Sequence, residues 1–221
     1  MPPQIKMKLI VTDPASIIER RVKDAIANHI NLAARLSIRE IRLKVVELLT
    51  KSILDSHEVK ALLDGTLRDE LGATQEEADA TIDFLINRLA ATTVIDFKPF
   101  HPYAKKFGGY LEVRCFPKTL IDDMIAFPKA SFLTKKGVNI PWMEWLLTFG
   151  DKILVKRYTV DFFRTSGSRS GGATMKPVKR GGWRIPSGFS GTRNDNFITR
   201  ALDDLADYIG YIMRTELVKK I

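Results

Sequence analysis

Helical spacing dominates residues 13 to 92 and then stops, and this change constrains the fold more than any other feature of the chain. Apolar residues recur there at intervals of three and four, as on one face of a helix. Residues 94 to 163 instead carry short alternating runs, and prolines interrupt them too often for long helices. Residues 197 to 219 return to helical spacing, with Asn196 as the expected N-cap. Helices, then strands, then a helix predict an α+β fold.

Several start signals divide the helical segment. In chain order they are Asp13 with Pro14 in the first turn, the capping-box pattern Ser37–Glu40, Ser56, and the capping-box pattern Thr74–Glu77. The pattern at Ser37 predicts a second helix or a restart at that point. Before it, one apolar face is expected to consist of Ile17, Ile18, Val22, Ile26, Ile30 and Ala33.

The strand candidates are residues 5–11, 94–100, 110–116 and 153–163, and residues 173–178 are expected to pair back on the last of these. Residues 119–127 fit a strand or a helix, and residues 141–149 predict a short helix that ends at Gly150. We therefore expect a single domain over residues 1–221. Long amino-terminal helices and a carboxy-terminal helix would pack on a small, mostly antiparallel sheet. A helical insert is expected at about 37–92 and an extended Gly-rich basic arm at about 164–192.

The net charge of +9 is concentrated in one part of the chain. Residues 152–200 contain eleven lysines and arginines but only two acids, Asp161 and Asp195, so this stretch accounts for the whole excess. The same stretch contains the Gly/Ser-rich runs 166–172 and 181–192. Such a strip predicts contact with something outside its own core, either an anionic polymer or a neighbouring subunit.

Composition excludes several classes of protein. Cys115 is the single cysteine, which excludes an internal disulfide and a multi-cysteine zinc site. His29, His57 and His101 are too scattered to predict a metal cluster, and we expect no cofactor. The amino end lacks the apolar run of a signal peptide, and no stretch has the length of a membrane span. We therefore expect a soluble protein that is made inside the cell and has no membrane partner.

The catalytic patterns in the sequence are weak. The glycines near Gly171 lack the spacing and the lysine of a phosphate-binding loop. Asp161, Glu112 and the pair Asp122–Asp123 do not form the compact acidic pattern of a metal-dependent nuclease. Cys115 lies in an alternating strand pattern, which favours a buried small hydrophobic residue over a nucleophile. We expect a protein that is not an enzyme.

The basic strip itself has three interpretations: a solvated surface, a set of phosphate contacts, or a contact with another subunit that offers acids. Asp203, Asp204 and Asp207 are one conceivable set of such acids. Trp183 lies in a Gly-rich setting and is either an anchor at an interface or a side chain that covers its own core. Composition does not rank phosphate contact against subunit contact.

Four segments resemble structural proteins of tailed bacteriophages: Trp142–Gly150, Ser168–Met175, Trp183–Thr192 and Asn196–Leu202. The resemblance is to the neck or tail-completion proteins of the head–tail junction. In these, a Gly-Thr element such as Gly191-Thr192 precedes a closing helix such as Phe197–Leu202. The resemblance covers about a third of the chain, and a tail terminator protein is the alternative within the same assembly. A basic nucleic-acid-binding protein is the alternative of another class.

The resemblance implies a virion protein that is assembled in the host cytoplasm. It implies a homo-oligomeric ring, most simply a hexamer, with adjoining connector and tail proteins as partners and genomic DNA passing through the channel. The subunit-contact candidates are Arg164, Arg169, Gly171, Gly172, Trp183, Arg184, Pro186, Gly191, Thr192 and Arg193, and the phosphate-contact candidates are Lys176, Lys179 and Arg180. Under this hypothesis Trp183→Ala leaves the monomer folded and blocks assembly.

Overall fold

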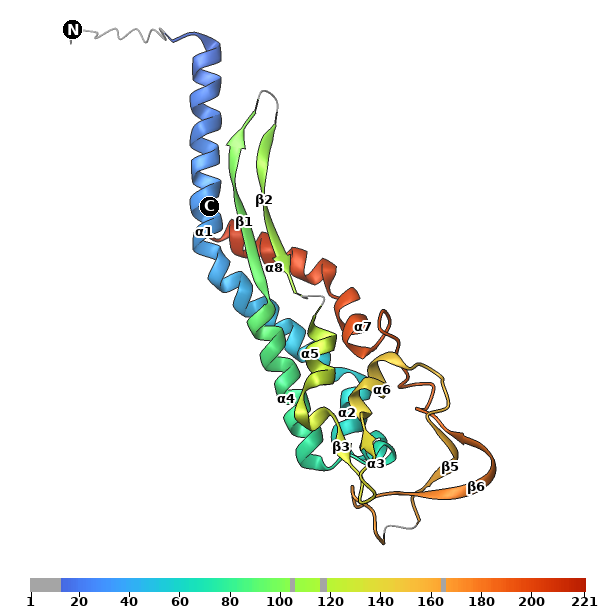
Figure 1. Cartoon of the computed structure of the whole chain (residues 1–221). Helices are drawn as coiled ribbons and strands as arrows, with labels where there is room; N and C mark the ends of the chain where they lie inside the picture. The colour runs from blue at the N-terminus through green and yellow to red at the C-terminus, as the bar shows by residue number, and fades with distance from the viewer. Residues whose placement is uncertain (1–12, 104–105, 116–118, 164–165) are drawn as a thin grey trace, which may run out of the picture.

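One long helix determines the shape of the molecule in the computed structural model, which describes residues 13–103, 106–115, 119–163 and 166–221. Helix α1 (Ala15–Asp55) has 41 residues and is therefore about 60 Å long. Its first half extends beyond the other helices, accompanied by the hairpin of β1 (Val94–Pro102) and β2 (Phe107–Arg114) (Figure 1). The second half lies in a body of shorter helices. The strand expected at residues 5–11 lies outside the described residues.

Helix α1 is continuous through Ser37, so the restart predicted there is wrong. The Ser37 hydroxyl donates to the carbonyl oxygens of Ala33, at 2.8 Å, and Glu216, at 2.9 Å, instead of capping a new helix. A serine inside a helix makes such bonds to the preceding turn, and here the second bond links α1 to the last helix. The helix begins after Pro14 and no side chain caps it, so the cap predicted at Asp13 is wrong.

Three helices follow α1 in the body: α2 (His57–Leu63), α3 (Thr66–Leu71) and α4 (Gln75–Thr92). The predicted caps are confirmed. Ser56 accepts from the Val59 amide, and Thr74 and Glu77 form a reciprocal capping box. Left-handed glycines, Gly65 and Gly72, flank α3.

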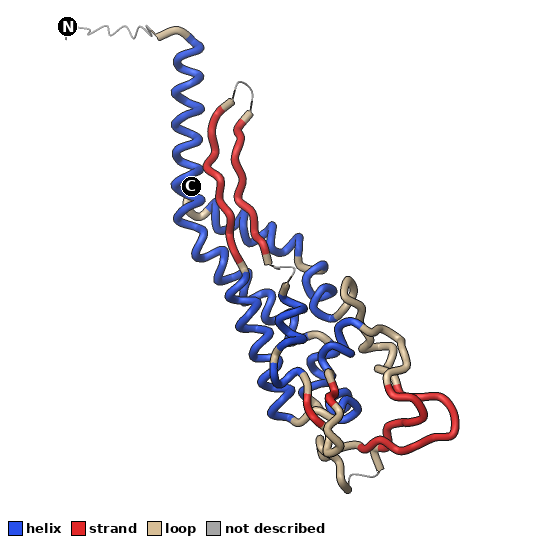
Figure 2. Tube along the Cα trace, viewed as in Figure 1, coloured by secondary structure: helices blue, strands red, loops and turns tan. Residues whose placement is uncertain are grey.

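The strands form three separate two-stranded antiparallel pairs: β1 with β2, β3 (Phe132–Leu133) with β4 (Asn139–Ile140), and β5 (Val155–Asp161) with β6 (Thr174–Trp183) (Figure 2). The α+β class is confirmed, with small antiparallel pairs in place of one sheet. Residues 119–127, which fit either state, contain helix α5 (Leu120–Ala126), and the single turn η1 (Pro128–Ala130) follows it. Helix α6 (Trp142–Thr148) ends before Gly150, as predicted, and Gly150 has a left-handed φ of +58°.

The single carboxy-terminal helix that the spacing predicts is divided into α7 (Phe197–Asp203) and α8 (Ala206–Val218). Asn196 caps α7 as predicted and accepts from the amides of Ile198 and Thr199. Helix α8 returns to α1, where the Ile221 carbonyl oxygen lies 3.1 Å from His29 Nε2.

The buried apolar residues form one cluster that reaches from α1 to α7. Helix α1 contributes Ile41, Val45, Leu49 and Ile53 to it, and α4 contributes Ile82, Leu85 and Leu89. Residues 37–92, which the sequence suggests as an insert, therefore build much of this core.

Candidate functional site

The basic strip is folded as the β5–β6 hairpin and the segment that follows it. The ladder pairs Lys156 with Gly182 and Tyr158 with Pro177, so Arg157 alone stands opposite the four residues 178–181. This irregularity bows β6 away from β5, on the side of the hairpin that points away from the body (Figure 1). Arg157 and residues 178–181 are called the basic arch below.

The cations of the hairpin differ in what they contact. Lys176 forms an ion pair of 3.0 Å with Asp161 and is therefore partly neutralised. Lys179 and Arg180, both in the arch, are exposed. The same is true of Arg184, just after β6. Within the part of the chain that the structure describes, these three form no ion pair and no side-chain hydrogen bond. Lys156 and Arg157 on β5, which the sequence did not single out, are also exposed and form no ion pair or side-chain hydrogen bond with a described residue. Arg164 lies outside the described residues.

Arg169 is held by its own chain. Its guanidinium forms a two-pronged ion pair with Glu77, donates to the Gly72 carbonyl oxygen at 3.1 Å, and lies 3.9 Å from the centre of the Phe132 ring. Burial by itself raises the pKa of Glu77, but the hydrogen bonds from Arg169 and Thr74 outweigh it, so the pKa lies below its ordinary value. The carboxylate thus closes the capping box of α4 and also fixes the 166–172 loop.

The two glycines of this loop have different constraints. Gly171 has a φ of +89°, a left-handed conformation that favours glycine. Gly172 packs so closely on the Asp69 carboxylate that a side chain at this position would overlap it. Both glycines let the loop lie against the end of α3.

Trp183 is also used inside the chain. Its side chain is only 7% exposed, its Nε1 donates to Glu70 at 3.3 Å, and its ring packs at 6.0 Å from that of Trp145. Burial raises the pKa of Glu70, and the bond from Trp183 opposes this increase. Trp183 therefore covers the core of its own chain and is not an exposed anchor for an interface.

The segment from Pro186 to Arg193 closes the fold on α6 and α7. The Gly191 carbonyl oxygen accepts from the Gly150 amide at 2.8 Å, and a Cβ at Gly191 would come within 2.8 Å of the Leu146 carbonyl oxygen. Thr192 bridges to Phe149, and Arg193 forms an ion pair with Asp122. The Pro186 carbonyl oxygen accepts from the amides of two residues in the following turn.

We predict that Arg169→Met makes the protein lose about 1–3 kcal/mol of unfolding free energy at neutral pH, because it leaves the buried Glu77 carboxylate without its charged partner. A folded-state pKa below the unfolded value means that the pair stabilises fully above the unfolded pKa. This stabilisation is lost as pH falls through the folded pKa, so stability should drop below pH about 4.3. Urea unfolding followed against pH measures both effects.

Lys129→Met is the matched control, because the Lys129–Glu76 pair is exposed and should contribute less than about 1 kcal/mol. Two outcomes would show that the 166–172 loop is not fixed through Glu77. One is an equal loss of unfolding free energy in both variants, and the other is an Arg169→Met protein whose stability falls at acid pH as in the wild type.

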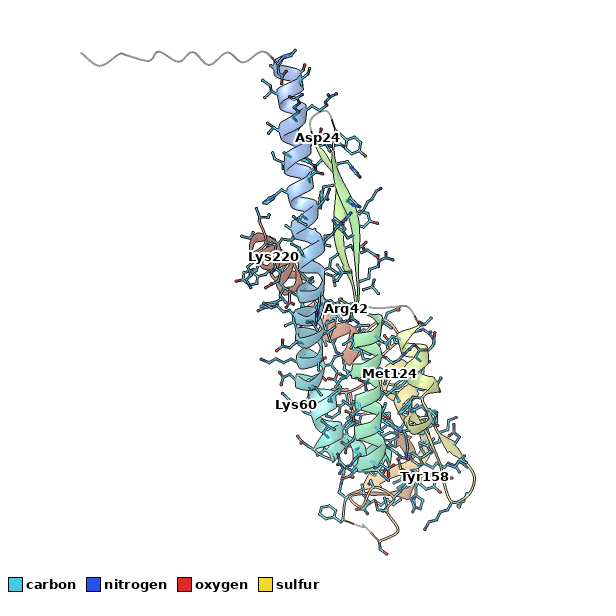
Figure 3. The ribbon with its side chains drawn as sticks, turned by 90° about the vertical axis from the view of Figure 1, so that its left-hand side faces the viewer. Asp24, Arg42, Lys60, Met124, Tyr158 and Lys220 are labelled. Carbon is cyan, nitrogen blue, oxygen red and sulfur yellow. The ribbon has the colours of Figure 1, made fainter. Side chains whose placement is uncertain are left out.

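A cleft of about 920 Å³ lies between the β5–β6 hairpin, the β3–β4 pair and the end of α3. Its walls are mainly apolar, and Phe132, Ile140, Trp145, Val160 and Met175 supply much of them. Tyr158 also lines it, and Figure 3 places this residue at the opposite end of the molecule from Asp24. Charged residues also line it, among them Asp69, Glu70, Lys135, Lys136 and Arg169. Of these, Arg169 is paired with Glu77, and Glu70 accepts from Trp183.

Sequence reasoning missed a second apolar face of α1. Its members are Ile18, Val22, Leu32, Leu36, Leu43 and Leu54, all exposed. At 100° per residue they fall within an arc of about 80°, and the buried Ile41, Val45 and Leu49 lie on the other side of the helix. We call this set the outer stripe. Ile18, Val22 and Ile26 were assigned to the core face but are exposed. Ala33 of the predicted set is buried, and Ala27 and Ala34 are buried with it in the first half of α1.

The spacing of Leu32, Leu36 and Leu43, at steps of four and seven, is the signal that would have found the outer stripe. Helix α8 adds a further exposed apolar face with Tyr208, Tyr211 and Val218. Two helices thus carry apolar surface that the described residues of the chain leave exposed.

The residues weighed for catalysis are distributed over several elements: Asp161 is in β5, Glu112 is in β2, and Asp122 and Asp123 are in α5. Asp161 pairs with Lys176, Asp122 with Arg193 and Asp123 with Arg88. Cys115 is half-buried, and burial raises the pKa of its thiol. Among the described residues, no group of three or more His, Cys, Asp or Glu side chains is arranged to hold a metal ion. The helices of the described part are all too short or too polar to cross a membrane.

Comparison with known proteins finds no match for this chain among family models, curated proteins or solved structures.

Proposed function

We propose that this chain is a structural subunit of a homo-oligomeric ring at the head–tail junction of a tailed bacteriophage, of the neck or tail-completion type. The observation that carries the proposal is the outer stripe of α1. Leu32 and Leu36 are 58% and 57% exposed in the single chain, in a row of six apolar residues that spans most of a 41-residue helix. His29, Glu40 and Glu47 lie in the same arc, so the apolar surface consists of patches, among them the neighbouring Leu32 and Leu36, and exposed apolar patches mark protein–protein contacts.

A closed ring needs two different faces on each subunit, because each copy meets its neighbours head to tail. The outer stripe supplies one face, and the exposed side of α8 with Tyr208, Tyr211 and Val218 supplies another. Many proteins form rings, and we favour a neck protein because the closing segment, residues 183–202, resembles neck proteins in sequence. The hexameric state, the adjoining connector and tail proteins, and the place in the virion belong to this proposal.

Electron microscopy of the purified chain tests the ring. We expect closed rings with an axial opening in negative stain, and a mass in solution that is a fixed multiple of 25.0 kDa. A protein that stays monomeric at all concentrations and salt conditions would contradict the proposal.

The place in the virion is tested in infected cells in which the gene has been silenced. We expect DNA-filled heads to accumulate separately from finished tails, because the joining piece is absent. Abnormally long or unfinished tails would assign the chain to the tail terminator instead. Normal joined particles would refute a role at the junction.

A further inference from the structure

We propose that the basic arch, with its two flanking cations, binds the phosphate backbone of double-stranded DNA. The five side chains are Lys156, Arg157, Lys179, Arg180 and Arg184. All are exposed, and within the described residues none forms an ion pair or a side-chain hydrogen bond. The carboxylate of the hairpin, Asp161, is paired with Lys176. The five cations on and next to the hairpin therefore repel one another, and they predict an external polyanion.

The backbone of the arch supports a dedicated role for these side chains. Arg157 has a φ of +59°, and it is the one non-glycine residue with a positive φ in the described part of the chain. A large side chain in this conformation stores strain, which is typical of functional positions. The strain arises where one residue of β5 faces four of β6, and bulges of this kind redirect side chains. Gly181, with a φ of +82°, completes the bend.

The composition of the arch favours nucleic acid over a protein partner. Protein interfaces centre on aromatic and apolar anchors and are depleted in lysine. Two aromatic residues adjoin the arch: Trp183 in β6 is buried in the core, and Tyr158 in β5, which is 39% exposed, lines the apolar cleft. The exposed Phe162 and Phe163 follow Asp161, at the opposite end of the β5 ladder. Within the arch, Val178 is the one apolar side chain, and it is half-buried.

The form of the hairpin favours a duplex over a single strand. A two-stranded β-ribbon fits the major groove of B-form DNA. Proteins that bind single strands stack successive bases on several exposed aromatic rings. Residues 178–181 contain none, and Tyr158 beside Arg157 is a single ring that lines the cleft. The contacts are to phosphates, so binding should be insensitive to base sequence.

The test measures the affinity of the purified full-length protein for a short fluorescent DNA duplex as a function of salt. With five phosphate contacts the slope of log K against log salt should be about −4.5, which is a roughly 500-fold loss of affinity from about 50 to 200 mM salt. For Lys179→Ala/Arg180→Ala, with three contacts left, the slope should be about −2.7 and the loss about 40-fold.

Two further variants separate the arch from effects of folding and of net charge. Arg157→Gly removes one cation, and glycine accepts the left-handed conformation, so the slope should fall by about one unit while stability is kept. Arg20→Ala/Lys98→Ala removes two exposed cations that lie outside the β5–β6 hairpin and form no ion pair with a described residue, so it should leave the slope unchanged.

Absence of salt-dependent DNA binding in the wild-type protein would overturn the proposal, as would an equal loss in the arch variant and the Arg20/Lys98 control. An arch variant that binds DNA normally but no longer assembles would also overturn it and assign the arch to a subunit contact. The inference does not require the ring. A ring that does not bind DNA would refute only the inference about the arch. A monomer that binds DNA through the arch would refute only the ring.

Discussion

Trp183→Ala is expected to reduce the unfolding free energy by about 3–5 kcal/mol, the usual cost of removing a buried tryptophan. The indole fills space between the β5–β6 hairpin and Trp145, and Ile185 beside it is fully buried. The change also leaves the Glu70 carboxyl without the hydrogen bond that opposes the effect of burial on its pKa. Urea unfolding monitored by circular dichroism measures this loss.

Trp183→Phe is the matched control, since it keeps an aromatic ring in the space but removes the Nε1 donor. It should cost about 1 kcal/mol for the lost hydrogen bond, plus a smaller amount for the reduced ring. The outcome expected from the sequence alone was a folded monomer that no longer assembles. A Trp183→Ala protein of unchanged stability that fails to assemble would restore that interpretation and contradict the one from burial.

Leu32→Glu/Leu36→Glu is expected to abolish assembly and to leave the monomer folded. Both side chains are more than half exposed in the single chain, so unfolding free energy should change by no more than about 0.5 kcal/mol. In the ring the two leucines would be covered, and each covered leucine contributes about 1.5–3 kcal/mol. Loss of at least about 3 kcal/mol per contact weakens association more than a hundredfold. Native mass spectrometry gives the distribution of oligomers.

Arg35→Glu makes the same change of two charge units next to Leu36, at about 100° around the helix from the outer stripe. It should assemble as the wild type does. Loss of assembly in both variants would point to net charge as the cause, and normal assembly of the double variant would remove the outer stripe from the subunit contact.

The sequence by itself determined the features that depend on bonds within a few residues. Ser56, Thr74 with Glu77, and Asn196 cap helices as predicted, because a side chain and an amide two or three residues apart meet wherever the chain enters a helix. The pairing of residues 153–163 with residues 173–178 was also predicted, since a β-branched and aromatic run that is followed by a Gly/Ser-rich loop can pair with the segment after that loop. These local signals were sufficient for the α+β class.

The tertiary structure decided which helix faces are covered. Helix α1 has apolar residues on two sides, and periodicity cannot tell which side the body will bury, so Ile18 and Val22 were assigned to the wrong face. The Ser37–Glu40 pattern does not start a helix, because α8 supplies the Glu216 carbonyl oxygen to the Ser37 hydroxyl. Arg169 meets Glu77 across 92 positions of sequence. Tertiary packing determines which residues meet at such distances in the sequence. The sequence alone therefore cannot tell which cations are paired, like Arg169, and which form no ion pair with a described residue, like those of the basic arch.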